Sequence, residues 1–547
     1  MDRTSKEQRP VLIYDEGCPI CRKAAHWVER NKRGDVLELV PCQAEAVRDR
    51  FPFMKETVCM KAMQLILPDG RVLPGEKALP EIINSLRRYY WVAWLFRFPG
   101  SGILSHAFYR WFAERRYRIA KMFFSERNKS FGVRLPVGSN VRIGILGGGF
   151  AGLYAIFYLR KFFPEGIDIT LFDKDNYFLY TPVLHEMATG TVNARHVVIP
   201  IREVVNPRKV HIRCEEVTRV DVEKKVVESP SGEFKFDYLV LAQGSEPNFY
   251  CFPNLQESAI TFKSIEDAIR LRNNLTGMLE KAALERDRKK RRSLLTITVA
   301  GGGCTGVELV AEIAQFIKVI LRKDYPEINR SEVRVVLIEA MDRILPSFPR
   351  YLSNVATERL RQMGAEVLLN SPIQNVDKDN IDLKDGKLSN GILVWAAGVK
   401  ARPLPLSPEQ KRDPNNRISV NENLEIPGYP GVYLIGDGAL FINNGIPLPP
   451  TASVAVQEAK FVAQNILLRS QKKEPPPFRF RYRGDMASLG FMFGVAEVYG
   501  RQFKGFPAWI IWKAFKLGML PRYKNRFQIV ADWLITLLFK RDTSKLM

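Results

Sequence analysis

The fold is decided by the stretch Val141-Arg-Ile-Gly-Ile-Leu-Gly147-Gly-Gly149-Phe-Ala-Gly152-Leu-Tyr-Ala155 and its continuation to Ile169-Thr-Leu-Phe-Asp173. A short apolar run typical of a buried parallel strand leads into a Gly-x-Gly-x-x-Gly turn, and the apolar spacing that follows favours a helix. The glycines permit a tight turn, the close approach of a pyrophosphate, and contact between helix and strand. The order strand, turn, helix, strand therefore predicts an α/β dinucleotide-binding unit.

Asp173 ends the second strand at the position where a carboxylate can accept hydrogen bonds from ribose hydroxyls. The N-terminus of the intervening helix offers unpaired N–H groups and a positive dipole end to phosphate. We therefore expect the first nucleotide site to contain Gly147, Gly149, Phe150, Ala151, Gly152, Asp173 and Lys174.

A second copy of this pattern begins at Leu295-Thr-Ile-Thr-Val-Ala-Gly301-Gly-Gly303-Cys-Thr305-Gly306, and the following strand ends at Glu339. Two fingerprints, each with its own acidic residue, predict two dinucleotides in one chain. A carboxylate at position 339 would repel a 2′-phosphate, so NADH is favoured over NADPH. Arg334 and Arg343 lie near enough in sequence to leave some use of NADPH open.

Length and charge limit the classes of protein to consider. A chain of 547 residues is too long for a single core, and its formal net charge of +23 predicts an anionic partner. A membrane surface is expected, and nucleic acid is not. No secretory signal and no uninterrupted apolar run long enough to span a membrane is found in the sequence. The sequence therefore predicts a peripheral protein on the cytoplasmic side of the inner membrane.

Cys18 and Cys21 follow a short apolar run and precede a helical pattern. Two cysteines three positions apart at a helix start face the same way, and the helix dipole favours a thiolate, which suits thiol-disulfide exchange. The stretch Tyr14-Asp-Glu-Gly-Cys18-Pro-Ile-Cys21 resembles the DCC family of thiol-disulfide oxidoreductases, and this likeness implies a thioredoxin-like domain. Two alternatives stay open, namely a zinc site completed by Cys42 and Cys59, and an inactive docking module. We expect no metal, and the sequence does not identify the partner of the dithiol.

Further segments resemble the two-dinucleotide flavoproteins and, among them, the type II NADH:quinone oxidoreductases. They are Thr181-Pro182, Ala242-Gln-Gly244, Ala397-Gly398, Gly436-Asp437 and Ala452-Ser453-Val-Ala-Val-Gln457. The resemblance implies FAD on the first fingerprint, with Asp437 near its ribityl and pyrophosphate region, and NADH on the second. It places Glu308 near nicotinamide and flavin, and Gln457 near flavin and quinone. Gln243 and Ser453 depart from the usual threonine and glutamine of the family.

The C-terminal segment from Gly505 holds two apolar stretches rich in tryptophan, lysine and arginine. Both are too short and too interrupted to span a bilayer, and this composition suits helices lying in the headgroup plane. The alternative is a pair of helices that pack on the core or on a dimer partner.

These features predict an α/β chain with a thioredoxin-like domain, two Rossmann-like domains, the NAD domain being inserted in the FAD domain, and an amphipathic helical membrane anchor. The expected boundaries are 1–125 for the dithiol domain, 126–140 for a linker, 141–263 and 399–470 for the FAD domain, 264–398 for the NADH domain, and 471–547 for the membrane-associating domain.

The expected activity is non-proton-pumping transfer of electrons from NADH through FAD to a membrane quinone by a homodimeric enzyme, with an accessory or regulatory dithiol. Two alternatives remain. One is a flavin-linked reductase that delivers electrons to Cys18 and Cys21, and the other is a non-enzymatic, membrane-docking redox sensor.

Overall fold

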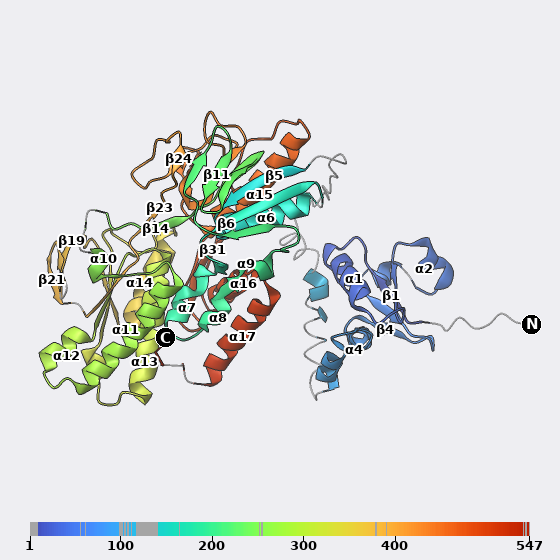
Figure 1. Cartoon of the computed structure of the whole chain (residues 1–547). Coiled ribbons are helices and arrows are strands. Elements are labelled where there is room, and N and C mark those ends of the chain that lie inside the picture. The colour runs from blue at the N-terminus through green and yellow to red at the C-terminus, as the bar shows by residue number, and fades with distance from the viewer. Residues whose placement is uncertain are drawn as a thin grey trace, which may run out of the picture. The chain divides into compact units, whose positions relative to one another are not determined.

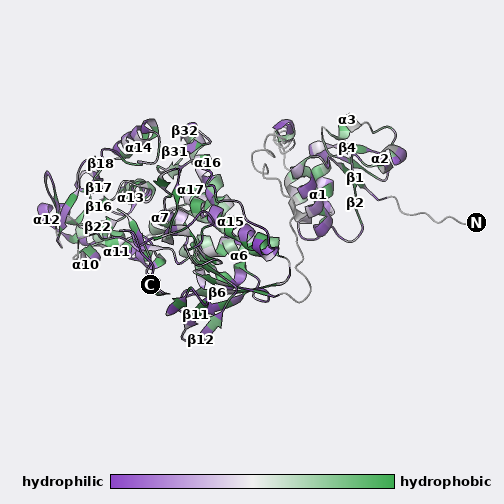
Figure 2. Cartoon of the chain, turned by 90° about the horizontal axis from the view of Figure 1, so that it is seen from above, coloured by the Kyte–Doolittle hydropathy of each residue, from purple (hydrophilic) through white to green (hydrophobic). Residues whose placement is uncertain are grey.

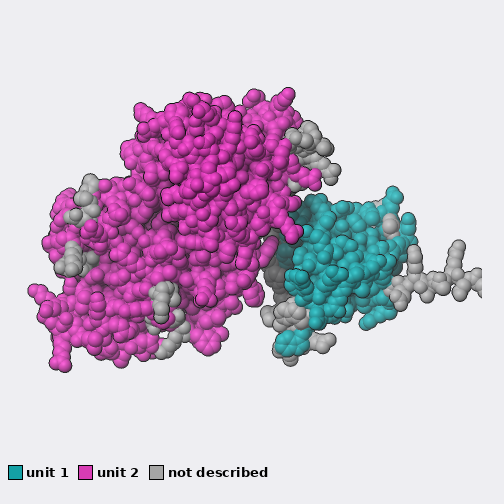
Figure 3. Space-filling view, viewed as in Figure 1, with its two compact units in different colours: residues 1–131 teal, residues 132–547 magenta. Residues whose placement is uncertain are grey.

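The computed structural model describes residues 9–54, 56–60, 62–97, 102, 106, 109–110, 112–115, 140–163, 165–250, 252, 255–377, 380–389, 391–539, 541 and 544–545. The chain divides into two compact units, residues 1–131 and 132–547 (Figure 3). The predicted linker, residues 126–140, lies outside the described residues except for position 140. The domain boundaries given above remain predictions.

The N-terminal unit is built on a four-stranded sheet of order β2-β1-β3-β4. Its elements are β1 (Val11–Tyr14), α1 (Pro19–Asn31), β2 (Glu38–Pro41), α2 (Glu45–Arg50), α3 (Glu56–Cys59), β3 (Gln64–Ile66), β4 (Val72–Pro74) and α4 (Leu79–Asn84). Strands β1 and β2 are parallel, whereas β3 is antiparallel to β1. Helix α1 carries both hydrophilic and hydrophobic residues (Figure 2) and buries Ala25 and Val28.

The second unit contains two parallel five-stranded sheets with matching arrangements of strands. The first consists of β26 (Val432–Leu434), β13 (Tyr238–Leu241), β5 (Val141–Leu146), β6 (Ile167–Asp173) and β9 (His211–Cys214). The second consists of β15 (Ile260–Thr261), β22 (Ile392–Trp395), β16 (Thr296–Ala300), β17 (Arg334–Ile338) and β18 (Ala365–Leu368). In each, the strand before the glycine turn lies at the centre, beside the strand that leads to the acidic residue. Strand β26 joins the first sheet only after the chain has completed the second.

The longer helices surround the two sheets, and two of them, α6 and α13, begin at the glycine turns. The helices around the sheets are α6 (Phe150–Phe162), α11 (Ile265–Leu284), α12 (Arg288–Leu294), α13 (Cys304–Lys323), α14 (Arg350–Gln362) and α15 (Ala452–Ser470). Helix α15 lies beside α6 (Figure 1). A capping box between Ser264 and Asp267 starts α11, and the Thr451 side chain caps α15. By contrast, α6 and α13 begin at Gly149 and Gly303 without a side-chain cap.

Smaller elements surround the two sheets. One antiparallel group is β10 (Arg219–Asp221), β11 (Val226–Ser229) and β12 (Gly232–Lys235), with β24 (Leu406–Ser407) added parallel to β10. Another antiparallel group is β19 (Ile373–Val376), β20 (Asn380–Leu383) and β21 (Gly386–Ser389). Two-stranded pairs are β7 (Tyr177–Leu179) with β8 (Val198–Pro200), β14 (Ser245–Pro247) with β23 (Val399–Ala401), β25 (Ile418–Ser419) with β27 (Ala439–Leu440), and β28 (Ile442–Asn443) with β29 (Ile446–Pro447). Short helices α7 (Leu184–Ala188), α8 (Ala194–Val197), α9 (Ile201–Val204) and α10 (Leu255–Ser258) link them.

The C-terminal segment forms a small sheet followed by two helices. The strands are β30 (Met486–Ser488), β31 (Gly494–Val498) and β32 (Arg501–Gly505), and the helices are α16 (Phe506–Met519) and α17 (Tyr523–Leu538). Among the described residues, no helix is long and apolar enough to cross a bilayer.

Candidate active site

The first glycine turn is shaped by close contacts within the chain. Gly147 has a φ of +101°, and a methyl group there would collide with the carbonyl oxygen of Ala242, which follows β13. A methyl group on Gly152 would collide with the carbonyl oxygen of Gly147. Both glycines are therefore required by the fold itself.

Gly149 is different, because no heavy atom lies within 4 Å of a methyl group built on it, and its φ is −73°. Gly303 at the second turn matches it, with open space and a φ of −71°. The folding of the chain does not need glycine at either position. What glycine provides there is room for a ligand to approach the first N–H groups of α6 and α13, as a dinucleotide pyrophosphate requires.

The acidic residues after the second strands hold the glycine turns in place. Asp173 accepts a hydrogen bond from the N–H of Gly148, and Glu339 accepts one from the N–H of Gly302 at 2.6 Å. Burial raises the pKa of Asp173 above its ordinary value. Each carboxylate thus binds the backbone of its own glycine turn, whereas the sequence predicted that it would bind a ribose. The arrangement is the same at both turns.

The remaining pieces of the first site converge at the end of the sheet. A methyl group on Gly436 would lie 3.1 Å from Cβ of Ala151, so the return segment lies against the start of α6. Asp437 accepts hydrogen bonds from Ser245 Oγ and from Lys263 Nζ, the latter at 3.5 Å. Sequence reasoning missed Ser245 and Lys263.

Other predicted site residues occupy turns and helix starts. Thr181 and Pro182 open a 3₁₀ turn before α7, Ala242 and Gly244 follow β13, Ala397 and Gly398 follow β22, and Ala452 and Ser453 begin α15. The buried Gln243 Oε1 has no hydrogen-bond partner among the described residues. An unsatisfied buried acceptor in this turn is consistent with a bound ligand.

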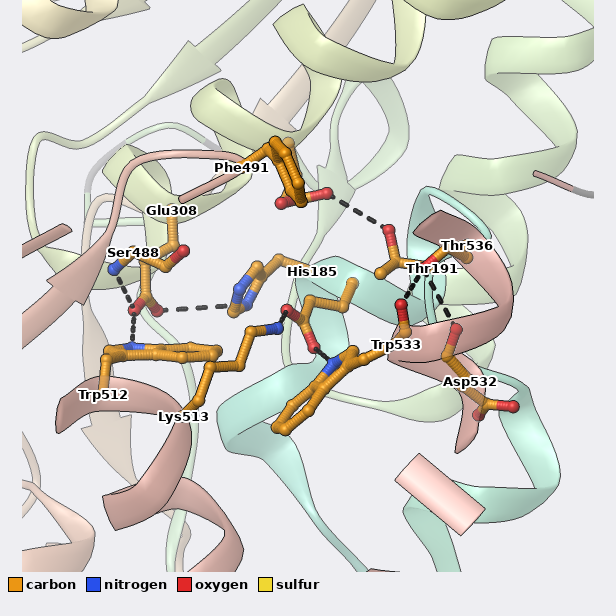
Figure 4. A network of polar contacts seen from close by, with 12 residues as sticks. His185, Thr191, Glu308, Ser488, Phe491, Trp512, Lys513, Asp532, Trp533 and Thr536 are labelled. Atoms are coloured by element: carbon orange, nitrogen blue, oxygen red, sulfur yellow. Dashed lines mark hydrogen bonds and ion pairs between the residues drawn. The ribbon is translucent and has the colours of Figure 1, made fainter. Parts of the chain in front are cut away.

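Glu308, in the first turns of α13, is buried with 6% of its surface exposed. Its Oε1 accepts hydrogen bonds from Trp512 Nε1 at 2.6 Å and from the N–H of Ser488 at 3.1 Å. His185 Nδ1 lies 3.9 Å from its other carboxylate oxygen (Figure 4). The Nε2 atom of His185 is buried and has no partner among the described residues.

Two further carboxylates continue this network on the same side of the protein. Glu186, from α7, accepts hydrogen bonds from Lys513 Nζ and from Trp533 Nε1, the latter at 2.8 Å (Figure 4). Glu312, one turn beyond Glu308, pairs with Arg541 at 3.2 Å. Burial would raise the pKa of Glu312, but Arg541 and other nearby cations hold it below its ordinary value. The sequence did not predict this network.

The contacts of Trp512 and Trp533 correct one part of the sequence interpretation. Both indoles were expected at a headgroup plane, yet Trp512 is completely buried and both N–H groups bind carboxylates of the core. The alternative, packing on the core, is therefore right for this face of α16 and α17. Their other face exposes large apolar side chains, among them Phe506, Ile510, Tyr523, Phe527, Leu534, Ile535, Leu538 and Phe539.

Gln457 lies on α15, with its amide turned to the backbone of Arg481. Its Nε2 donates to the carbonyl oxygen of Arg481 at 3.1 Å, and its Oε1 accepts from the N–H of Arg481 at 3.2 Å. Glu308 and Gln457 are thus both tied to the segment 481–488, the first through Ser488 and the second through Arg481.

In the N-terminal unit, Cys18 occupies the N-cap position of α1 and Cys21 lies in the first turn, so both are at a helix start, as predicted. Cys18 is buried and Cys21 is partly exposed. Cys42 and Cys59 form a disulfide with each other, which contradicts the alternative in which they complete a zinc site. The sequence missed this pair because the two cysteines are separated by 17 positions.

Comparison with known families matches three segments of the chain. Residues 141–459 match the pyridine nucleotide-disulphide oxidoreductase family, residues 12–122 the DCC1-like thiol-disulfide oxidoreductases, and residues 482–542 the NDH2 C-terminal domain. The type II NADH:quinone oxidoreductase Ndh of Mycobacterium tuberculosis is 32% identical over 417 residues, which cover 73% of this chain and 89% of that protein. The chain belongs to the type II NADH:quinone oxidoreductases.

A second relative supports the membership in this oxidoreductase family, and a solved structure shows the same fold. A probable NADH dehydrogenase of Dictyostelium discoideum is 31% identical over 417 residues, which cover 74% of this chain and 91% of its own length. The structure of NDH2 from Plasmodium falciparum in complex with NADH has the same fold, with a TM-score of 0.68 and 24% identity over 74% of this chain and all of that one. The resemblance found in the sequence is therefore confirmed, including its DCC-like N-terminal part.

Proposed function

We propose that the second unit oxidises NADH and reduces a membrane quinone, with FAD held at Gly149 and NADH at Gly303. The observation that carries this assignment is that both glycines face open space at helix starts without a side-chain cap. FAD would supply the two-electron chemistry that links a nicotinamide to a quinone. The chain's own residues position these groups and handle protons.

Phosphate binding falls to the backbone at both turns. The N–H groups at the start of α6 and of α13 lie where the helix dipoles add positive potential. Asp437, with hydrogen bonds from Ser245 and Lys263, is proposed to orient the ribityl and pyrophosphate region of FAD. Glu339 is proposed to disfavour a 2′-phosphate and so to select NADH.

Proton supply is the proposed task of Glu308. Reduction of a quinone to a quinol consumes protons, and Glu308 is a buried carboxylate beside the imidazole of His185. Trp512 and Ser488 fix the carboxylate in one orientation, so a proton held on its free oxygen faces His185. Gln457 is proposed to fix the segment 481–488 beside the quinone rather than to react itself.

Membrane attachment is proposed for the exposed apolar face of α16 and α17, where Phe527 and Leu538 expose 78% and 80% of their surface. Apolar side chains on helices with basic neighbours suit a monotopic contact with anionic lipid. We propose the cytoplasmic face of the inner membrane as the location of the protein. A homodimer is proposed on the family resemblance alone, and sedimentation of the FAD-loaded protein tests it.

Two matched variants test the cofactor assignment. Gly149→Ala should fold but lose FAD affinity by about 5- to 150-fold, because a methyl group obstructs the pyrophosphate at a cost of roughly 1–3 kcal/mol. Gly303→Ala should keep its flavin and lose NADH affinity by a similar factor. Each variant is the control for the other. The assignment would be overturned if both variants lost flavin equally, or if neither variant lost affinity for either ligand.

A further inference from the structure

The N-terminal unit contains a cavity of about 420 Å³ that the proposed NADH:quinone reaction does not use. This volume lies within the range of small-molecule sites, which are apolar with a few well-placed polar groups. Aromatic side chains of Trp27, Tyr89, Tyr109 and Phe112 contribute to its walls, and Cys21 supplies a thiol.

Contacts across the unit hold these walls in place. The N–H of Met63 donates to the Tyr109 hydroxyl at 3.3 Å, and the Tyr109 ring covers Gly75, where a methyl group would lie only 2.7 Å from Cε1. The rings of Trp27 and Tyr89 lie 5.4 Å apart. Both are about two-fifths exposed, so they form a rim that a ligand can reach from solvent.

The position of the two cysteines adds redox chemistry to this cavity. Cys18 occupies the N-cap position of α1 and Cys21 lies in its first turn, so only Pro19 and Ile20 separate the two cysteines. Two thiols this close in sequence can close to a disulfide and release two electrons. The cavity is thus an apolar site with one thiol of the pair, Cys21, in its wall.

We propose that this cavity binds a quinone, which oxidises the dithiol of Cys18 and Cys21. The Cys21 sulfur adds to the quinone and the ring takes its proton. Cys18 then attacks Cys21 Sγ, the bond between Cys21 and the ring breaks, and the electron pair and the second proton leave with the ring as hydroquinone. One quinone and two thiols become one hydroquinone and one disulfide.

A quinone fits better than other apolar ligands for two reasons. It is a planar ring that can lie against aromatic walls, and it accepts the two electrons and two protons that a dithiol releases. Quinone is also the substrate in the names of this chain's relatives, so both units would meet it at the same membrane. The reaction is separate from flavin turnover, because its groups all belong to the N-terminal unit.

The test uses the full-length, FAD-loaded protein with a pre-reduced dithiol, without NADH and without oxygen. Tetramethyl-1,4-benzoquinone is added, and mass spectrometry follows the disulfide between Cys18 and Cys21 while absorbance follows the hydroquinone. One hydroquinone should form per disulfide. Tetramethylbenzene, which has the shape but no redox chemistry, should slow the reaction by competition.

Two variants of helix α1 locate the reaction. Ala24 lines the cavity and is exposed, so Ala24→Trp should fill it without disturbing the core and slow disulfide formation at least tenfold. Lys23→Trp, at the adjacent exposed position outside the lining, should react like the wild type. Equal rates in the two variants, or no disulfide with the wild type, would overturn the proposal. NADH:quinone turnover, measured separately, should be unchanged in both, so failure of the flavin reaction is recognised independently.

Discussion

The indole of Trp512 donates a hydrogen bond of 2.6 Å to Glu308, although the two residues are 204 positions apart. This contact joins the last helices of the chain to the helix that starts at the second glycine turn. The same face of α16 carries Lys513, which binds Glu186 from the first dinucleotide half. The C-terminal helices are therefore integral to the proposed active site.

Trp512→Phe should lower both stability and activity. It removes a hydrogen bond to a buried carboxylate, a loss of about 1.5–3 kcal/mol, and leaves Glu308 with the N–H of Ser488 as its remaining fixed donor. Urea unfolding of the FAD-loaded protein measures the stability and quinone reduction the activity. Trp509→Phe, on the same helix with its ring stacked on Phe506, is the control and should change both by much less.

Lys513→Met should destabilise the protein by about 3–5 kcal/mol, because it leaves the carboxylate of Glu186 buried without its cation. The double variant Glu186→Gln with Lys513→Met should recover most of this loss. A double-mutant cycle by urea unfolding gives the coupling energy. Additive losses in the cycle would mean that the two side chains do not form a buried pair.

Glu458 should make stability depend on pH. Burial raises the pKa of this carboxyl, whose oxygen accepts from the N–H of Gly436, to about 8. Between the ordinary pKa of a glutamate and this raised value, the Glu458 carboxyl keeps its proton in the folded protein but loses it in the unfolded chain. This stabilisation is therefore complete at pH below about 4.3 and is lost as pH rises toward 8, by up to about 1.4 kcal/mol per unit.

Glu458→Gln should remove that dependence. Thermal midpoints of wild type and variant should move apart between pH 5 and pH 8, with the variant falling less. Parallel curves would show that Glu458 titrates normally in the folded protein.

Charges on the exposed face of α17 should weaken binding to lipid. Phe527→Glu with Leu538→Glu should reduce flotation with anionic vesicles at least tenfold, while leaving turnover of a water-soluble quinone analogue nearly intact. Ile446→Glu is the control, since this residue of the β28–β29 hairpin is 70% exposed and lies outside the two helices. Unchanged flotation of the double variant would contradict the assignment of this face to the membrane.

The accessory role of the dithiol gives the last prediction. Replacing Cys18 and Cys21 by serine should change the rate of quinone reduction by NADH less than about twofold, because the proposed flavin reaction uses groups of the second unit. Steady-state kinetics with a short-chain quinone measures this. A large loss of turnover would place the dithiol in the main electron path.

Local patterns accounted for the parts of the fold that short segments specify. The turns at Gly147 and Gly301 were predicted because strand, glycines and helix follow one another directly in sequence. The position of Cys18 and Cys21 at the start of α1 was predicted for the same reason. Such features depend on backbone geometry within about twenty residues.

The network around Glu308 could not be predicted in this way, since its pairs join residues up to 347 positions apart. Lys513 was predicted to lie near lipid headgroups, but it binds the buried carboxylate of Glu186. A single lysine directly after Trp512 in an apolar stretch is compatible with either environment. Cys42 and Cys59 likewise give no spacing pattern. Folding of the N-terminal unit brings together Cys42, which follows β2, and Cys59, at the end of α3.

The C-terminal helices also bear on how the protein is made. Residues 506–539 leave the ribosome after both five-stranded sheets have been synthesised, yet they carry the side-chain donors to Glu186 and Glu308. Until then both carboxylates must stay hydrated, so neither dinucleotide half can close its core completely. Nascent chains halted before α16 should therefore be bound by chaperones and cleaved by proteases. Synthesis of the last two helices would complete the packing of both dinucleotide halves.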